Sequence, residues 1–181
     1  MIGVIVDGPG DFASLRARFS GTMKVRKATG PRGHTVTIAQ LLSSARRQVR
    51  QLALEGCDKV LLLFDYEMRT ERYADFIRTA QAEADRQSFA VPVVVCAANR
   101  MIENWYLADV EELSRRRVYI RPKLRQRNFE GLHGKDELKK LLRSNIKYDE
   151  IGQGRQLFCT IRLEVAGANS PSLQSFLTAL P

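Results

Sequence analysis

The chain has 181 residues, of which 44% are hydrophobic, and it carries a formal net charge of +9. This length fits one domain with its own core, and the three cysteines form no C-x-x-C pair, which argues against a disulfide framework or zinc knuckle and fits a reducing cytoplasm. Because neither a signal peptide nor a membrane-length apolar run is found, we expect a cytoplasmic protein without membrane contact. The excess of positive charge is typical of proteins that bind nucleic acid, because phosphate contacts release counterions.

Predicted strands and helices alternate through the first part of the chain. Residues 2–6 are small or apolar, as in a buried parallel strand, and the turn at residues 8–10 precedes a helix that begins near Phe12 with Asp11 as its cap. This alternation predicts an α/β fold with a mainly parallel sheet and helices on both faces. The later predicted elements are a strand at 22–28, a loop at 29–34, a helix from Thr35 or Thr37 to about Glu55 that Gly56 ends, a strand at 59–64, a helix at about 70–87, a strand at 91–97 and a helix at 101–113.

The sequence changes character after residue 113. Helices are predicted at 135–144, about 148–165 and 172–180. We therefore expect a core over 1–113, with a basic segment and a helical C-terminal extension over 114–181 packed on the same domain. Seven basic residues and no acidic one lie between Leu113 and Phe129, and the segment is either a nucleic-acid contact or a solvated loop. These residues are Arg115, Arg116, Arg117, Arg121, Lys123, Arg125 and Arg127.

Acidic side chains follow three of the predicted strands. Because the carboxyl ends of parallel strands meet at one edge of a sheet, where ligands bind, we expect these carboxylates to gather there. Like charges that close are unfavourable unless a cation compensates them, and Mg²⁺ takes oxygen ligands. The acids are Asp7, Asp11, Asp65, Glu67, Glu103 and Asp109.

The acids differ in how strongly they indicate a site. Asp65 and Glu67 would point the same way if their strand continued, so they are the strongest candidates for metal or phosphate chemistry. Asp7 fits a turn and Asp11 fits a helix cap, which are ordinary structural roles. Glu103 fits the first turn of a helix, where the helix dipole favours an acid.

Several other kinds of site are disfavoured. We expect Asp109 to be structural, while Arg100 is either an ion-pair partner of Glu103 or a phosphate ligand. His34 and His133 lack the spacing of a zinc site. The chain contains neither a G-x-S-x-G elbow nor a phosphate-binding P-loop, and the turn at 8–10 lacks the third glycine of a dinucleotide fingerprint.

The acidic pattern resembles the Toprim fold, the catalytic domain of topoisomerases, primases and OLD-type nucleases. That family carries an acidic turn after its first strand and an acidic pair after a later one, and the corresponding residues here are 7–11 (DGPGD) and 65–67 (DYE). More specifically, the chain resembles an uncharacterised Toprim-like family of small bacterial proteins, often encoded beside an AAA-type ATPase. Residues 102–109 (IENWYLAD) and 170–176 (SPSLQSF) carry that resemblance, which spans essentially the whole chain.

The resemblance implies a nuclease or other phosphodiesterase that depends on Mg²⁺ or Mn²⁺. Its place would be phage defence or DNA maintenance, with an ATPase partner gating the activity. Asp7 aligns with the acid/base carboxylate of the family, so Asp7 and Asp65 are the expected catalytic residues. Arg100 and Lys135 are expected to clamp phosphate. The expected metal ligands are Asp7, Asp11, Asp65, Glu67 and Glu103.

Departures from the family pattern leave other functions open. Aspartate replaces glutamate at both turn positions, which shortens each reach by one methylene, and Glu67 lengthens the reach of the pair. The main alternative is a non-catalytic module that binds an ATPase or nucleic acid. A receiver-like phosphoacceptor domain is disfavoured, because the strand at 91–97 leads to Asn99 and Arg100 instead of a lysine.

Overall fold

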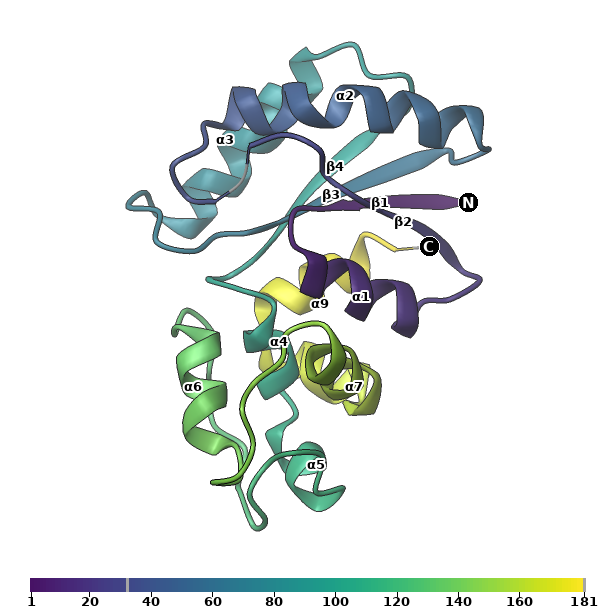
Figure 1. Cartoon of the computed structure of the whole chain (residues 1–181). Helices are drawn as coiled ribbons and strands as arrows, with labels where there is room; N and C mark the ends of the chain where they lie inside the picture. The colour runs from purple at the N-terminus through teal and green to yellow at the C-terminus, as the bar shows by residue number, and fades with distance from the viewer. Residues whose placement is uncertain (32, 181) are drawn as a thin grey trace.

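The computed structural model describes residues 1–31 and 33–180 and contains an all-parallel sheet with helices on both faces (Figure 1). The strand order is β2-β1-β3-β4, and the register aligns Val6 with Lys27 on one side and with Leu63 on the other. The predicted α/β fold is confirmed. The strands are β1 (Ile2–Val6), β2 (Met23–Lys27), β3 (Lys59–Asp65) and β4 (Val93–Ala98).

One face of the sheet is covered by α2 (Ile38–Leu54) and α3 (Tyr73–Arg86), which are drawn above it in Figure 1. Alternate strand residues face these helices, because successive side chains of a strand point to opposite faces. Thr37 caps α2 as predicted, since its hydroxyl accepts a hydrogen bond from the Gln40 backbone at 3.3 Å. Gly56 follows the helix end with a φ of 86°, a conformation that favours glycine.

The opposite face of the sheet shares one hydrophobic core with the other helices. In that core, the ring of Trp105 lies 5.2 Å from that of Phe176 and 6.5 Å from that of Phe158. No helix within residues 1–31 and 33–180 is long and apolar enough to cross a membrane. The helices are α1 (Pro9–Arg18), α4 (Glu103–Leu107), α5 (Val110–Arg115), α6 (Gly134–Leu141), α7 (Gly152–Thr160), α8 (Leu163–Asn169) and α9 (Pro171–Thr178).

Three local predictions need correction. The helix predicted at 101–113 is divided into α4 and α5, and the one predicted at about 148–165 is divided into α7 and α8. Asp11 is not the cap of α1, because the helix already begins at Pro9 with Gly8 as its cap. The predicted loop at 29–34 is confirmed except at Arg32, which lies outside the described residues.

Candidate functional site

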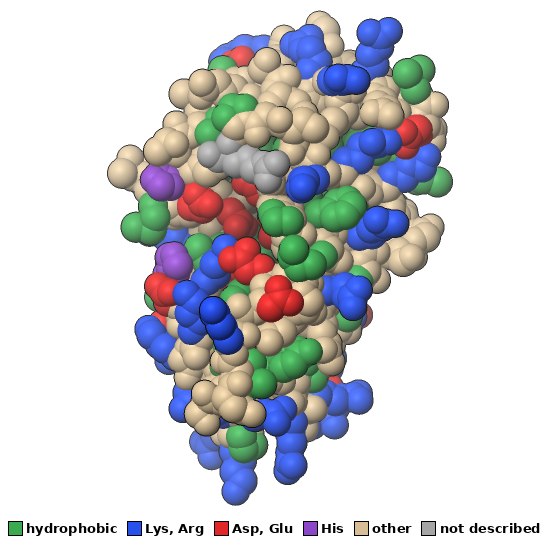
Figure 2. Space-filling model, viewed as in Figure 1, with side chains coloured by type: hydrophobic (Ala, Val, Ile, Leu, Met, Phe, Trp, Pro, Cys, Tyr) green, Lys and Arg blue, Asp and Glu red, His purple; other side chains and the backbone are tan. Residues whose placement is uncertain are grey.

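A cavity of about 170 Å³ lies where the carboxyl ends of β1 and β3 meet helices α1, α4 and α6. Figure 2 shows acidic side chains gathered around a hollow on this face, with lysine and arginine side chains around them. The carboxyl edge of a parallel sheet is where such folds bind ligands. The ionisable side chains that line the cavity are Asp7, Asp11, Asp65, Glu67, Glu103, Tyr106, Lys135 and Glu150.

Asp7 and Asp11 form a buried pair at the start of α1. Asp7 directly follows β1, and Asp11 turns back from the first helical turn so that its Oδ2 accepts a hydrogen bond from the Gly8 backbone at 3.2 Å. The pKa of Asp11 is raised to about 7. Burial is the largest cause, and the charge of Asp7 and a hydrogen bond between the two carboxyl groups add to it. Two carboxyl groups can share such a bond only when one is protonated, so near neutral pH this pair retains a proton for part of the time.

Asp65 is the last residue of β3, and its Oδ1 accepts a hydrogen bond from the Ile102 backbone at 3.0 Å. Burial raises the pKa of Asp65 well above its ordinary value, and the charges of Asp11, Asp7 and Glu103 add to this effect. The neighbours of Asp65 favour its protonated form unless a cation enters the cavity.

Glu103 is 2% exposed and lies in the first turn of α4. Its Oε1 accepts a hydrogen bond from the Tyr148 hydroxyl at 3.0 Å, whereas its Oε2 is buried with no hydrogen-bond partner among the described residues. Burial raises the pKa of Glu103 to about 7, although the charge of Lys135 opposes the shift. An unsatisfied buried carboxyl oxygen is costly, so this atom is suited to accept a proton or contact a cation.

Lys135 brings a positive charge to the cavity from the first turn of α6. Its Nζ lies 2.8 Å from Oε1 of Glu150. Burial alone would lower the pKa of Lys135, but the hydrogen bond to Glu150 and the charges of Glu103 and Asp65 outweigh burial and raise it. Lys135 therefore stays protonated, as its predicted role as a phosphate clamp requires.

Glu67 lines the cavity, but the strand before it does not continue as far as Glu67. Strand β3 ends at Asp65, and Glu67 has a φ of 52°, so the two carboxylates do not project in parallel. Glu67 Oε2 accepts a hydrogen bond from the His34 backbone at 2.8 Å and lies 3.3 Å from its Nδ1. Glu67 therefore holds the loop that follows β2 against the cavity.

Arg100 and part of the basic segment contact the protein itself. Arg100 donates hydrogen bonds to the carbonyl oxygens of Glu67 at 2.5 Å and Gly131 at 3.2 Å. Arg115 and Arg116 both bind the Glu112 carboxylate. Arg127 binds Glu137, and Arg121 donates a hydrogen bond to the Lys140 carbonyl. The other three basic residues form no ion pair of 4 Å or less with a described carboxylate; they are Arg117, Lys123 and Arg125. None of the seven lines the cavity, and their contact with nucleic acid stays a prediction.

Two tyrosines beside the carboxylates were not identified from the sequence. Tyr106 shares a hydrogen bond of 2.9 Å with the Ser14 hydroxyl, and Tyr148 donates to Glu103. Burial and the charge of Glu103 raise the pKa of both phenols, so they remain hydrogen-bond donors at neutral pH. Tyr106 lies three residues after Glu103 on one helix face, which was a usable signal. Tyr148 is 45 residues away from Glu103 in sequence and gave none.

The side chains around the cavity fit a hard divalent cation by their chemistry. In the described part of the chain, no group of three or more His, Cys, Asp or Glu side chains is already arranged to hold a metal ion. However, carboxylate oxygens face the cavity, and one of them, Oε2 of Glu103, is buried with no hydrogen-bond partner among the residues that the structure describes. Mg²⁺ often uses only one or two carboxylates and keeps several waters, so it fits such a cavity better than zinc does.

A comparison with known protein families gave one match, over residues 12–181, to a domain of unknown function, DUF4276. The chain belongs to the DUF4276 family. The predicted membership of an uncharacterised family is thus confirmed, whereas the Toprim relationship stays a prediction. The DUF4276 match includes Asp65, Glu103 and Lys135 but begins just after Asp7 and Asp11. Neither curated proteins nor solved structures gave a match.

Proposed function

We propose that this DUF4276 protein is a phosphodiesterase that depends on Mg²⁺ or Mn²⁺ and cleaves nucleic acid at the carboxylate cavity. The observation that carries the proposal is the convergence of Asp7, Asp11, Asp65 and Glu103 on one small cavity. These four residues come from separate parts of the chain, at the ends of β1 and β3 and the starts of α1 and α4. Such a convergence costs stability, and a cation-dependent reaction accounts for it.

The cavity is electrostatically suited to exchange protons for a cation. Without a cation, the raised pKa values of Asp11 and Glu103 leave both carboxyl groups partly protonated near neutral pH. A divalent ion would favour their ionised forms, and it would supply charge neutralisation and activation of water for attack on phosphorus. Asp7, Asp11, Asp65 and Glu103 are the residues that would hold it.

The other residues of the cavity have separate roles in this proposal. Lys135 is protonated and binds a non-bridging phosphate oxygen, exchanging part of its contact with Glu150. Tyr148 fixes the orientation of Glu103 through its hydroxyl group. Asp7 would take a proton from water, as the Toprim resemblance implies. A Toprim-like origin, an ATPase partner and a role in phage defence belong to the same proposal and rest on that resemblance.

Cleavage assays with matched isosteric variants test the function. Purified protein is incubated with single-stranded DNA, duplex DNA and RNA in Mg²⁺ or Mn²⁺. We expect Asp65→Asn and Asp7→Asn to lower the cleavage rate by at least about 100-fold. Mutation of residues that only hydrogen-bond to metal ligands already lowers activity by up to about that factor. The control is Asp75→Asn, which removes a partly exposed carboxylate of α3 outside the cavity. Cleavage by Asp65→Asn at the wild-type rate would refute the proposed site.

A non-catalytic binding module is the second candidate function. It is favoured by one observation, that no metal-binding group is preformed among the described residues. A binding module would retain salt-sensitive affinity for nucleic acid in EDTA and show no cleavage with any substrate or metal. Cleavage by wild-type protein that Asp65→Asn abolishes would exclude this candidate.

A further inference from the structure

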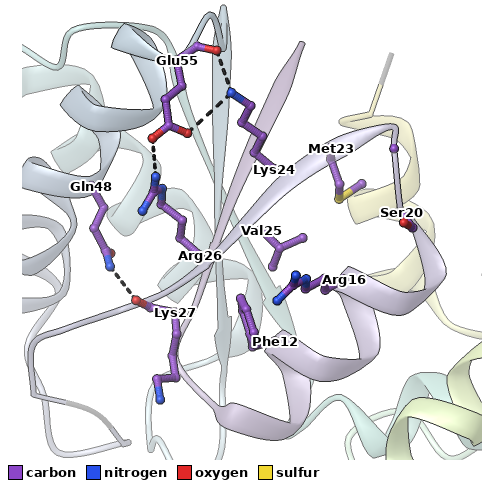
Figure 3. A pocket seen from close by; sticks show the side chains of 11 residues that line it. Phe12, Arg16, Ser20, Met23, Lys24, Val25, Arg26, Lys27, Gln48 and Glu55 are labelled. Atoms are coloured by element: carbon purple, nitrogen blue, oxygen red, sulfur yellow. Dashed lines mark hydrogen bonds and ion pairs between the residues drawn. The ribbon is translucent and has the colours of Figure 1, made fainter.

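A second and larger hollow, of about 680 Å³, runs along the edge strand β2 (Figure 3). Strand β2 pairs only with β1 in the sheet of the described residues, so its other side is open. Helix α1 forms one wall with Phe12 and Arg16, and α2 contributes Gln48. We call this hollow the β2 groove.

The β2 groove is positively charged. Four cations line it, Arg16, Lys24, Arg26 and Lys27, against the single carboxylate of Glu55. Figure 3 shows Lys24 and Arg26 directed to Glu55, whereas Arg16 and Lys27 point elsewhere. Arg16 and Lys27 are exposed, and no ion pair joins either of them to a described residue. The groove thus keeps an excess of positive charge that solvent ions or a ligand must balance.

The β2 groove adjoins the carboxylate cavity. Lys27 is aligned with Val6, the residue immediately before Asp7. On α1, Asp11 lines the cavity and the next residue, Phe12, lines the groove. The groove and the cavity are therefore neighbours at the carboxyl end of β2 and the first turn of α1.

The groove offers the two features that bind single-stranded nucleic acid, cations for the phosphates and an aromatic ring for a base. The half-buried ring of Phe12 lies 5.7 Å from the guanidinium carbon of Arg16, so together they form a surface for stacking. The five residues of β2 give the groove a length of about 17 Å. In a duplex the bases are stacked inside the helix and are not free to stack on Phe12.

We propose that the β2 groove binds single-stranded nucleic acid and leads it to the carboxylate cavity. The inference rests on the proposed nuclease function, since it names the substrate class and its path. It assigns the main phosphate contacts to the groove instead of the basic segment at 115–127.

Binding is measured by fluorescence anisotropy of a labelled oligothymidylate in EDTA, so that cleavage plays no part. We expect Arg16→Glu/Lys27→Glu to weaken binding at least tenfold and to reduce the salt slope by about 1.4, as two lost contacts to a single strand imply. The control is Arg78→Glu/Arg86→Glu, with the same charge change on α3, which packs against the opposite edge strand β4. When the salt concentration is adjusted to offset the change in net charge, this control should bind with the affinity of the wild type.

Two further variants test separately the charge of the groove and its aromatic ring. Glu55→Gln should tighten binding by about twofold or more, because it removes the one opposing charge in the groove. Phe12→Leu should weaken binding by about tenfold without changing the salt slope, because stacking is not ionic. Thermal unfolding checks that each variant is folded.

Certain results would overturn the inference. They are an absence of single-strand binding by the wild type, equal affinity for a blunt duplex, or a greater loss from Arg117→Glu/Arg125→Glu in the basic segment than from the groove variant. The nuclease proposal fails separately. If the groove variants behave as expected but no substrate is cleaved, then the groove stands as a binding site and the phosphodiesterase does not.

Discussion

Glu103 is the residue where burial and charge conflict most plainly. It is 2% exposed, one carboxyl oxygen is bonded to Tyr148, and the other has no partner among the described residues. A buried carboxylate in that condition is stable only if it is protonated or close to a cation. Lys135 supplies part of that charge, but burial outweighs it and raises the pKa of Glu103 to about 7. By donating its hydroxyl proton to Glu103, Tyr148 therefore fixes the orientation of the carboxyl group that would bind a metal ion.

Removing the Tyr148 hydroxyl tests this account of Glu103. We expect Tyr148→Phe to destabilise the protein by about 1–2 kcal/mol, since a buried acceptor loses its donor, and to weaken Mg²⁺ binding by about tenfold. Urea unfolding and Mg²⁺ titration measure the two effects. The control is Tyr119→Phe, whose hydroxyl bonds near the surface to the neutral Gln156 at 2.5 Å. Equal losses in both variants would show that Tyr148 has no special role.

At the scale of elements, an ion pair between a buried carboxylate and a half-exposed arginine joins two helix breaks. Asp109 lies between α4 and α5 and is 1% exposed, and its carboxylate accepts hydrogen bonds from the Arg162 backbone at 2.9 Å and from its guanidinium at 2.7 and 2.9 Å. Arg162 lies between α7 and α8. This contact holds α4, which carries Glu103, in a fixed position relative to α7.

Breaking this pair should cost stability. We expect Asp109→Asn to destabilise the protein by about 3 kcal/mol, at the low end for a buried pair because Arg162 is half exposed. The matched control, Asp136→Asn, disrupts exposed pairs with His133 and Lys139 and should cost less than about 1 kcal/mol. Chemical unfolding compares the two variants. A similar small cost for both would contradict the structural role of Asp109.

Elements that follow from local sequence patterns were predictable, whereas the two helix breaks were not. The strands and α2 follow from local patterns of apolar residues, caps and glycine, and the structure contains them near the predicted bounds. The two helix breaks lie at Asp109 and Arg162, which contact each other across 53 positions of sequence, and no local pattern reveals that contact. The condition under which Asp65 and Glu67 would project the same way, a strand that continues past Asp65, is not met because a turn with positive φ follows β3, although both residues line the cavity.

The candidate site was likewise only partly predictable. Strand ends in a parallel sheet place Asp7 and Asp65 at one edge, so their meeting follows from the fold. Lys135 is predicted from the sequence as a phosphate clamp, but its position in the cavity depends on how α6 packs against α4. Tyr148 and Glu150 come from a loop whose sequence has no distinctive pattern. Their positions required the tertiary structure.

At the scale of the whole molecule, the acidic cavity contrasts with a net charge of +9. Basic groups surround the cavity on the exposed surface, as Figure 2 shows, while the acids lie inside it. Such a surface attracts polyanions, and the cavity would repel them unless its acids are neutralised. We therefore expect the stability of the protein to depend on pH and on divalent cations, because both change the protonation of the carboxyl groups in the cavity.

The metal-free protein should lose stability as the pH rises from about 5 to about 8. The folded-state pKa values of Asp11 and Glu103, both about 7, are above their ordinary values of 3.8 and 4.5, so folding favours the protonated forms. Their contribution is fully present below the unfolded-state values and is lost as the pH rises through 7. Urea unfolding in EDTA at several pH values measures this trend. Added Mg²⁺ should restore stability most strongly at the highest pH, and a stability that rises steadily to pH 8 in EDTA would contradict the prediction.

The central claim, that the carboxylate cavity exchanges protons for a divalent cation, is tested most directly by calorimetric titration of Mg²⁺ into metal-free protein near pH 6.5. Performing the titration in two buffers with different ionisation enthalpies gives the number of protons released. We predict saturable binding with net proton release by the wild type, and neither in Asp65→Asn. Absence of binding by the wild type, or binding that Asp65→Asn leaves unchanged, would contradict the account.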